Sequence, residues 1–124
     1  MIILQSQPLP VYKGRSMRTD DLYGFGNDDL EMARAAVEQA LGIRLIAHES
    51  LYFGGDYYRL GRMREEHFIL RRNIDLLDNE PAELEFPKMG ILLYVEGTER
   101  SRELEQILTS KIPGLLLLRR KKYN

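Results

Sequence analysis

The chain has 124 residues, a formal net charge of −1, an apolar content of 44% and a charged content of 30%. These values are typical of one globular domain, and they exclude a disordered tail and a membrane protein. The absence of cysteine removes disulfides, thiolate metal ligands and thiol nucleophiles together. We therefore expect a single soluble domain spanning residues 1–124 in the bacterial cytosol.

The start of the chain predicts one strand and a long connection. Residues 1–7 are mostly apolar and lack a basic lead or a cleavage site, which indicates a short strand and not a signal peptide. Residues 8–27 contain several prolines and glycines, which indicates an irregular segment. A connection of this length is unusual inside a compact domain, so it is either a functional loop or a missed element.

The first helix is predicted over residues 28–41. Asn27 or Asp28 can cap its start, Glu31 follows Asp28 at capping-box spacing, and Gly42 stands just past its end. The apolar positions that recur at helical spacing, and that we expect to face the core, are Leu30, Ala33, Val37, Ala40 and Leu41.

The middle of the chain predicts an antiparallel meander. Segments 43–48, 56–60 and 66–72 have the alternating pattern of strands, and glycines at 54, 55 and 61 indicate turns between them. Residues 73–87 lose this period and carry two prolines and five carboxylates. We expect them to form an exposed loop.

The last third of the chain predicts a strand, a helix and a strand. Residues 90–95 and 115–120 are largely apolar runs, which favours strands that are covered on both faces or central in a sheet. Thr98 is the expected cap of a helix that continues to about Ser110. The complete pattern predicts an α+β fold, with a mainly antiparallel sheet of four to six strands and two helices packed on one face.

Carboxylates are concentrated in two segments that contain no lysine or arginine. Residues 20–31 carry Asp20, Asp21, Asp28, Asp29 and Glu31, and residues 75–85 carry Asp75, Asp78, Glu80, Glu83 and Glu85. A helix start attracts carboxylates through its dipole, which explains part of the first segment without any ligand. The functional interpretation is a basic partner that docks on both segments.

Few residues point to catalysis or to a metal. His48 and His67 are the only histidines, and they can act as base and acid only if the meander brings them together. A metal site would have to use these histidines with Glu49 and Asp56, whose spacing matches no known pattern. We therefore predict a protein without catalytic residues, metal or cofactor.

Basic residues offer an alternative function. The candidates for nucleic-acid contact are Arg71, Arg72 and the tail Arg119-Arg120-Lys121-Lys122, although a pI near 6.1 disfavours this binding. A small-molecule-sensing domain is a further alternative, and it requires a dry, concave pocket.

Several short segments, spread over most of the chain, accompany the acidic helix start. They are Tyr23-Gly24-Phe25-Gly26, Gly55-Asp56-Tyr57-Tyr58-Arg59, Phe68 to Asn73, Phe86-Pro87 and Leu92-Leu93-Tyr94-Val95. Together they resemble the small bacterial immunity proteins of polymorphic toxin systems, including contact-dependent growth inhibition. The resemblance implies a non-enzymatic protein that binds the toxic C-terminal domain of a cognate toxin and blocks it.

On this interpretation the acidic segments and nearby aromatic residues contact the toxin. The expected carboxylates are Asp28, Asp29, Glu31, Asp75, Asp78, Glu80, Glu83 and Glu85, and the expected aromatic anchors are Tyr52, Phe53 and Tyr57. A toxin that cuts nucleic acid presents basic surface to phosphate, so an acidic inhibitor can cover its active site. Aromatic residues are also common packing residues of sheets, which is the structural alternative for the anchors.

Overall fold

The computed structural model describes residues 17–123. Its elements, in chain order, are β1 (Arg18–Phe25), α1 (Leu30–Leu41), β2 (Ile46–Ser50), the short 3-10 helix η2 (Leu51–Phe53), β3 (Gly55–Leu60), β4 (His67–Arg72), β5 (Ile91–Thr98), α2 (Ser101–Lys111) and β6 (Leu116–Tyr123). The strand expected over residues 1–7 lies outside the described residues. Within 17–123, no helix is long and apolar enough to span a membrane.

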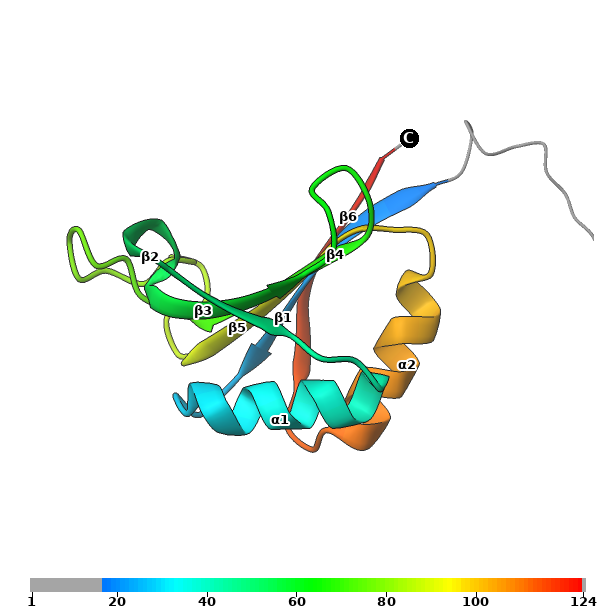
Figure 1. The fold of residues 1–124 in the computed structure, drawn as a ribbon, viewed down its shortest axis with the longest axis horizontal. Helices are drawn as coiled ribbons and strands as arrows, with labels where there is room; N and C mark the ends of the chain where they lie inside the picture. Colours follow the sequence, from blue (N-terminus) through cyan, green and yellow to red (C-terminus); the bar gives the residue numbers. More distant parts are fainter. Residues whose placement is uncertain (1–16, 124) are drawn as a thin grey trace, which may run out of the picture.

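The strands form one antiparallel sheet in the order β2-β3-β4-β5-β1-β6. Both helices cover the same face of this curved sheet, and in the described part of the chain no helix lies over the other face (Figure 1). Because β5 and β6 each pair antiparallel with β1, they run parallel to each other with β1 between them. The predicted α+β fold with two helices on one face is confirmed.

The segment predicted to be irregular contains an interior strand, β1. It pairs with β5 on one side and with β6 on the other, and it buries Tyr23 and Phe25 in the core. Gly24 lets two side chains pack closely on this strand, because a Cβ there would lie 2.6 Å from Sδ of Met89 and 2.8 Å from Cδ1 of Leu118, and both side chains would have to shift. This glycine therefore marks close packing and not a loop. Residues 8–16 of the predicted connection lie outside the described residues.

The core lies between the sheet and the two helices. The helix residues buried there are Leu30, Ala33, Val37 and Ala40 of α1 and Leu104 and Leu108 of α2. Leu41 packs at the edge of this cluster. The face that the helical spacing predicted for α1 is therefore confirmed. On the sheet side, Ile91, Leu93 and Val95 of β5 are fully buried.

Both helix caps differ from the prediction. α1 is capped by Asp29, one residue after Asp28, and the Asp29 carboxylate accepts a hydrogen bond from the Met32 backbone N–H at 3.0 Å. Thr98 ends β5, and Arg100 occupies the cap position of α2. The Thr98 hydroxyl still accepts from the Arg100 backbone N–H at 3.1 Å, so it supports the helix start from the preceding strand.

The last strand is an edge strand and not a central one. β6 pairs only with β1 among the described strands, and its Leu116 is half exposed. Arg119 and Arg120 follow the apolar run and form ion pairs with carboxylates. The other edge is β2, which begins at Ile46 instead of Ile43. The apolar run at residues 115–120 therefore predicted a strand correctly, but it did not predict that this strand lies at the edge of the sheet.

Candidate protein-binding surface

The two predicted acidic segments reach the same end of the sheet. β1 and β4 end there and β5 begins there, as the pairs Phe25–Ile91 and Arg72–Ile91 show. The backbone N–H of Gly90 donates to the Phe25 carbonyl at 2.9 Å. This bond joins the end of the loop over residues 73–90 to the chain that enters α1. Antiparallel pairing thus brings the two acidic segments side by side.

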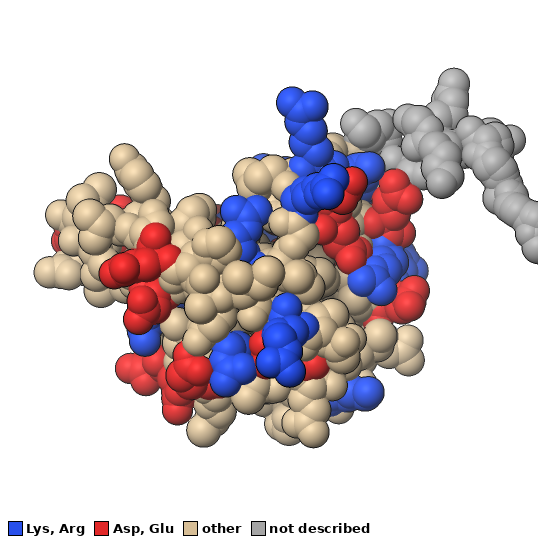
Figure 2. Space-filling model, viewed as in Figure 1, with Lys and Arg blue, Asp and Glu red and all other residues tan. Residues whose placement is uncertain are grey.

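We call this region the acidic end. Its carboxylates are Asp28, Asp29, Glu31, Glu49, Asp56, Asp75, Asp78, Glu80, Glu83 and Glu85. Figure 2 shows red side chains over the start of α1 and the end of β2, whereas blue side chains lie farther along α1 and at the β3–β4 turn. The sequence did not predict Glu49 and Asp56 as part of this surface, and they join it because β2 and β3 pair them at the sheet edge. Arg72 and Lys88 also lie at this end.

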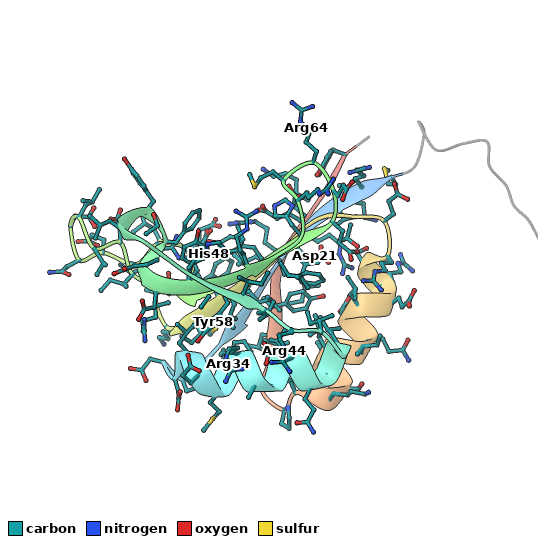
Figure 3. All side chains as sticks on the ribbon, in the orientation of Figure 1. Asp21, Arg34, Arg44, His48, Tyr58 and Arg64 are labelled. Carbon is teal, nitrogen blue, oxygen red and sulfur yellow. The ribbon has the colours of Figure 1, made fainter. Side chains whose placement is uncertain are left out.

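Glu31 is held by contacts within the protein. It accepts a hydrogen bond from the Tyr58 hydroxyl and pairs with Arg34 at 2.9 Å. Arg34 also lies 5.6 Å from the centre of the Tyr58 ring, and Figure 3 shows the two residues close together between β3 and α1. The hydrogen bonds from Tyr58 and Arg34 hold the pKa of Glu31 below its usual value. Glu31 therefore also links α1 to the sheet.

Glu83 is held more firmly, against the open face of the sheet. It accepts from the Tyr94 hydroxyl at 2.6 Å and from Arg119 at 3.0 Å, and Arg119 also reaches Glu85 at 3.6 Å. Burial by itself raises the pKa of Glu83, but the hydrogen bonds from Arg119 and Tyr94 outweigh it and hold the pKa below its usual value. Glu83 thus fastens the loop over residues 73–90, which we call the acidic loop, to β5 and β6.

The other carboxylates of the acidic end form no ion pair within residues 17–123. They are Asp28, Asp29, Glu49, Asp56, Asp75, Asp78 and Glu80. Asp75 and Asp78 each accept a backbone N–H at 2.9 Å, from Leu77 and Glu80 respectively, which shapes the turn. A carboxylate that uses one oxygen in this way keeps the other for a cationic partner.

One of the three predicted aromatic anchors is exposed. Tyr52 lies in η2 with 80% of its surface accessible. Phe53 is half-buried, with its ring centre 4.7 Å from that of Tyr57. Tyr57 is buried and stacks on His48 at 5.5 Å. Tyr57 is therefore a packing residue of the sheet, which corrects its assignment as an anchor.

Arg71, which suggested nucleic-acid binding, is 7% exposed and bonded inside the protein. Its guanidinium donates to the carbonyl oxygens of Arg72 at 3.0 Å, Tyr52 at 3.1 Å and Ile74 at 2.9 Å. It also lies 5.6 Å from the centre of the Phe53 ring. Burial lowers the pKa of Arg71 from its ordinary value. In this position Arg71 cannot reach a phosphate.

The basic tail is also partly used within the fold. Arg119 and Arg120 form ion pairs with carboxylates, while Lys121 and Lys122 are exposed. Of the residues predicted to contact nucleic acid, Lys121, Lys122 and the partly exposed Arg72 form no ion pair within residues 17–123. These three residues come from β4 and β6, two strands that are not neighbours in the sheet.

The two histidines do not meet. His48 is in register with Tyr57, which is in register with Arg71, whereas His67 pairs with Glu96. The histidines are therefore two strands apart and four residues apart along the strand direction, or roughly 13 Å at ~3.3 Å per residue. Both ring nitrogens of His67 lie within 3.0 Å of an oxygen atom. This arrangement does not provide a base and an acid for one substrate.

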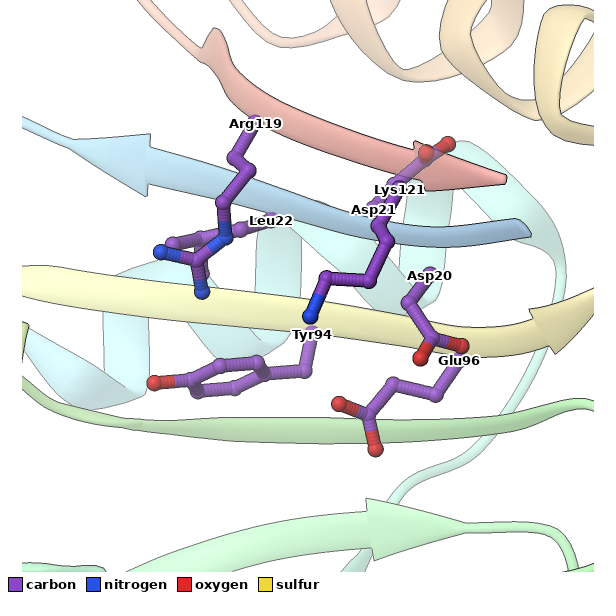
Figure 4. Close-up of a pocket in the computed structure, with 7 residues that line it drawn as sticks. All are labelled: Asp20, Asp21, Leu22, Tyr94, Glu96, Arg119 and Lys121. Carbon is purple, nitrogen blue, oxygen red and sulfur yellow. The ribbon is translucent and has the colours of Figure 1, made fainter. Parts of the chain in front are cut away.

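The open face of the sheet carries shallow polar clefts. Figure 4 shows one of about 80 Å³, in which Lys121 extends from β6 over the sheet, beside the carboxylates of Asp20 and Glu96. A second cleft of about 400 Å³ is open to solvent and is lined by charged residues, among them Arg18, Asp20 and Glu96, together with the apolar side chain of Met63. Neither is the dry pocket that a small-molecule sensor needs. Within residues 17–123, no three His, Asp or Glu residues are grouped so as to hold a metal ion.

No known protein family matches the chain, and no curated protein or solved structure matches it. The function must therefore be inferred from the surfaces of the protein itself.

Proposed function

We propose that this protein is an immunity protein of a bacterial toxin system. In the cytoplasm it binds the toxic C-terminal domain of its cognate toxin and neutralises it without catalysis. The observation that carries the proposal is the gathering of seven carboxylates at the acidic end, none of which has an ion pair within residues 17–123. They come from three separate stretches of the chain, 28–29, 49–56 and 75–80.

A surface of this kind suits a basic partner. A toxin that cleaves nucleic acid must expose lysine and arginine side chains to bind phosphate, and a surface rich in carboxylates can cover the same groups. The Debye length is about 8 Å at physiological salt, so carboxylates clustered at one end act together on an approaching partner. The expected consequence is rapid, salt-dependent association.

The acidic loop has its shape before any partner binds. The Asn73 side-chain amide donates to the carbonyl oxygens of Phe86 and Met89, both at 2.9 Å. Its oxygen accepts the backbone N–H of Glu83 at 2.9 Å. Asn73 thus closes the loop from within, beside the contacts of Glu83 with the sheet. A loop ordered in advance loses less conformational entropy on binding than a flexible one.

The first experiment is an affinity purification of the tagged protein from its native cells at near-physiological salt, with the bound proteins identified by mass spectrometry. We expect the C-terminal domain of a large toxin at a ratio near one to one. The purified domain should lose its toxic activity when this protein is added. Recovery of RNA or of no partner, or a domain that remains active in the complex, would contradict the proposal.

A matched pair of charge reversals then tests the surface. Asp28→Lys/Glu80→Lys changes two exposed side chains of the acidic end that form no hydrogen bond or ion pair within residues 17–123. Glu65→Lys/Glu103→Lys makes the same change in net charge away from that end. At low salt we expect the first variant to bind the toxin domain about tenfold more slowly, and the second to bind at close to the normal rate. Equal effects of the two variants would show that net charge alone matters and that the surface is wrongly assigned.

A further inference from the structure

An exposed apolar cluster stands within the acidic end. Leu51 and Tyr52 of η2 are 62% and 80% exposed, and Leu76 and Leu77 of the loop after β4 are 41% and 70% exposed. Scattered apolar residues are normal on a protein surface, but a contiguous group marks a binding site more often than chance. We call these four residues the apolar tip.

The two turns that form the apolar tip are in contact. A Cβ at Gly54 would lie 3.2 Å from the Ile74 carbonyl oxygen, and a Cβ at Gly55 would lie 3.6 Å from Cδ1 of Leu76. Gly54 and Gly55 have φ angles of 79° and 95°, a conformation that other residues rarely adopt. The glycine pair that predicted a turn therefore also lets η2 pack against the loop after β4.

The buried side chain of Arg71 links η2 to the loop after β4. It donates one hydrogen bond to the Tyr52 carbonyl at 3.1 Å and another to the Ile74 carbonyl at 2.9 Å. No carboxylate lies within ion-pair distance of Arg71 among the described residues. Burying a guanidinium without a paired carboxylate costs free energy, which the hydrogen bonds to three backbone carbonyls and the contact with the Phe53 ring offset. Arg71 thus keeps both halves of the apolar tip in a fixed relation.

Carboxylates flank the apolar tip in the sequence. Glu49 and Asp56 flank η2 in the sequence, and Asp75, Asp78 and Glu80 are close sequence neighbours of Leu76 and Leu77. None of the five has an ion pair within residues 17–123. Protein interfaces commonly place aromatic and aliphatic anchors at the centre and polar groups at the rim. The complementary surface is an apolar pocket bordered by lysine or arginine.

We propose that the apolar tip is the anchor by which this protein docks on a basic protein partner. Tyr52 and Leu77 enter an apolar pocket of that partner, and the surrounding carboxylates meet its lysine and arginine side chains. Arg71 is a positioning residue that acts through the backbone of both turns. The identity of the partner as a toxin domain rests on the proposed function, whereas the docking chemistry does not.

The test uses peptides as probes, so that it does not depend on finding the toxin. The full-length protein selects binders from a phage-displayed library of random twelve-residue peptides, and individual peptides are then measured by fluorescence anisotropy. We expect peptides with an aromatic or aliphatic residue flanked by lysine or arginine. Tyr52→Ala/Leu77→Ser should weaken their binding at least tenfold. Met32→Ser/Met63→Ser, which removes two other exposed apolar side chains, should leave binding within twofold.

A second variant tests the role of Arg71. Arg71→Lys keeps the charge but loses the planar group that reaches two carbonyls at once. We expect faster amide hydrogen exchange over residues 51–55 and 74–78, with weaker peptide binding. Exchange in β5 should not change. A variant with faster exchange everywhere would show a general loss of stability and overturn the positioning role.

Other outcomes separate the docking inference from the proposed function. Peptides that are acidic, or that bind Tyr52→Ala/Leu77→Ser normally, would overturn the apolar tip as a docking site for a basic partner. So would a dimer in solution that this variant dissociates, because the occupant would then be a second copy of the chain. A toxin domain bound and neutralised equally by wild type and variant would overturn the inference and leave the proposed function standing. Peptide binding at the apolar tip in a protein that has no toxin partner would support the docking inference and overturn the proposed function.

Discussion

Replacing Asp21 by asparagine tests how the fold uses its charges. Asp21 is 2% exposed, and Arg120 donates to both of its carboxylate oxygens, at 2.9 and 3.0 Å. The asparagine keeps one acceptor oxygen but turns an amide donor toward the guanidinium, so one charge-assisted hydrogen bond is lost, at ~1.5–3 kcal/mol. Arg120 retains Glu105 at 3.0 Å, which keeps the loss below the ~3–5 kcal/mol of a fully broken buried pair. We expect a loss of about 2 kcal/mol.

The assay is urea unfolding at pH 7, followed by far-UV circular dichroism because the chain has no tryptophan. A loss of about 2 kcal/mol lowers the melting temperature of a domain of this size by roughly 8 °C. Glu105→Gln removes the more exposed partner of Arg120 and should cost less than about 1 kcal/mol. In the double variant Asp21→Asn/Arg120→Met, the two effects should not add, because both remove the same contact.

An Asp21→Asn variant within about 0.5 kcal/mol of wild type would refute this reasoning, since that value is typical of a surface substitution. Additive effects in the double variant would also refute it. Either result would mean that the pair does not hold β1 and β6 together in solution. Ion pairs between the acidic and basic segments would then contribute less to the stability of the fold than the structure indicates.

Two further predictions concern the loop that carries the second acidic segment. Glu83→Gln should lower the free energy of unfolding at pH 7 by about 1 kcal/mol, because the ion pair with Arg119 is lost. The pKa of Glu83 is lowered in the folded protein, so its contribution is present above the ordinary value of 4.5 and disappears as the pH falls below the folded pKa. Unfolding at pH 7 and pH 3 should therefore show the difference between variant and wild type shrinking in acid, and an equal difference at both would contradict it. Gly90→Ala should cost more than about 2 kcal/mol, because its Cβ would lie 2.2 Å from the Asn27 carbonyl oxygen, whereas Gly26→Ala meets nothing within 4 Å and should be nearly neutral in thermal unfolding.

Local patterns in the sequence predicted most of the elements. The helical spacing of Leu30, Ala33, Val37 and Ala40 identified the buried face of α1, and the glycines after residue 53 identified the start of β3. These signals succeed because each depends on residues a few positions apart, whose period of burial follows from the helix or strand itself. The α+β class followed from the order of the elements.

The same local patterns misjudged β1. The prolines and glycines of residues 8–27, Gly24 and Gly26 among them, suggested an irregular segment, yet residues 18–25 pair on both sides. Asp21 is acceptable in a strand because Arg120 pairs with it inside the fold, and Gly24 because the side chains of Met89 and Leu118 pack closely against it. Both reasons lie far along the chain, so no window around β1 contains them.

The candidate surface was predicted in part. The sequence showed that residues 28–31 and 75–85 are acidic, and it included Tyr52, but it gave no sign that Glu31 and Glu83 are held by Tyr58 and Arg119. It also offered Arg71 as a candidate for the alternative function of nucleic-acid contact, whereas its buried guanidinium donates to backbone carbonyls.

The sequence by itself therefore determined the number and kind of most elements, the absence of any thiol chemistry and the presence of two acidic segments. The tertiary structure decided which charges remain available to a partner. Asp21 and Arg120 are 99 residues apart and meet only because β1 and β6 pair in one register. Strand register sets such meetings, and it depends on the packing of the whole sheet against its two helices, which no local pattern contains.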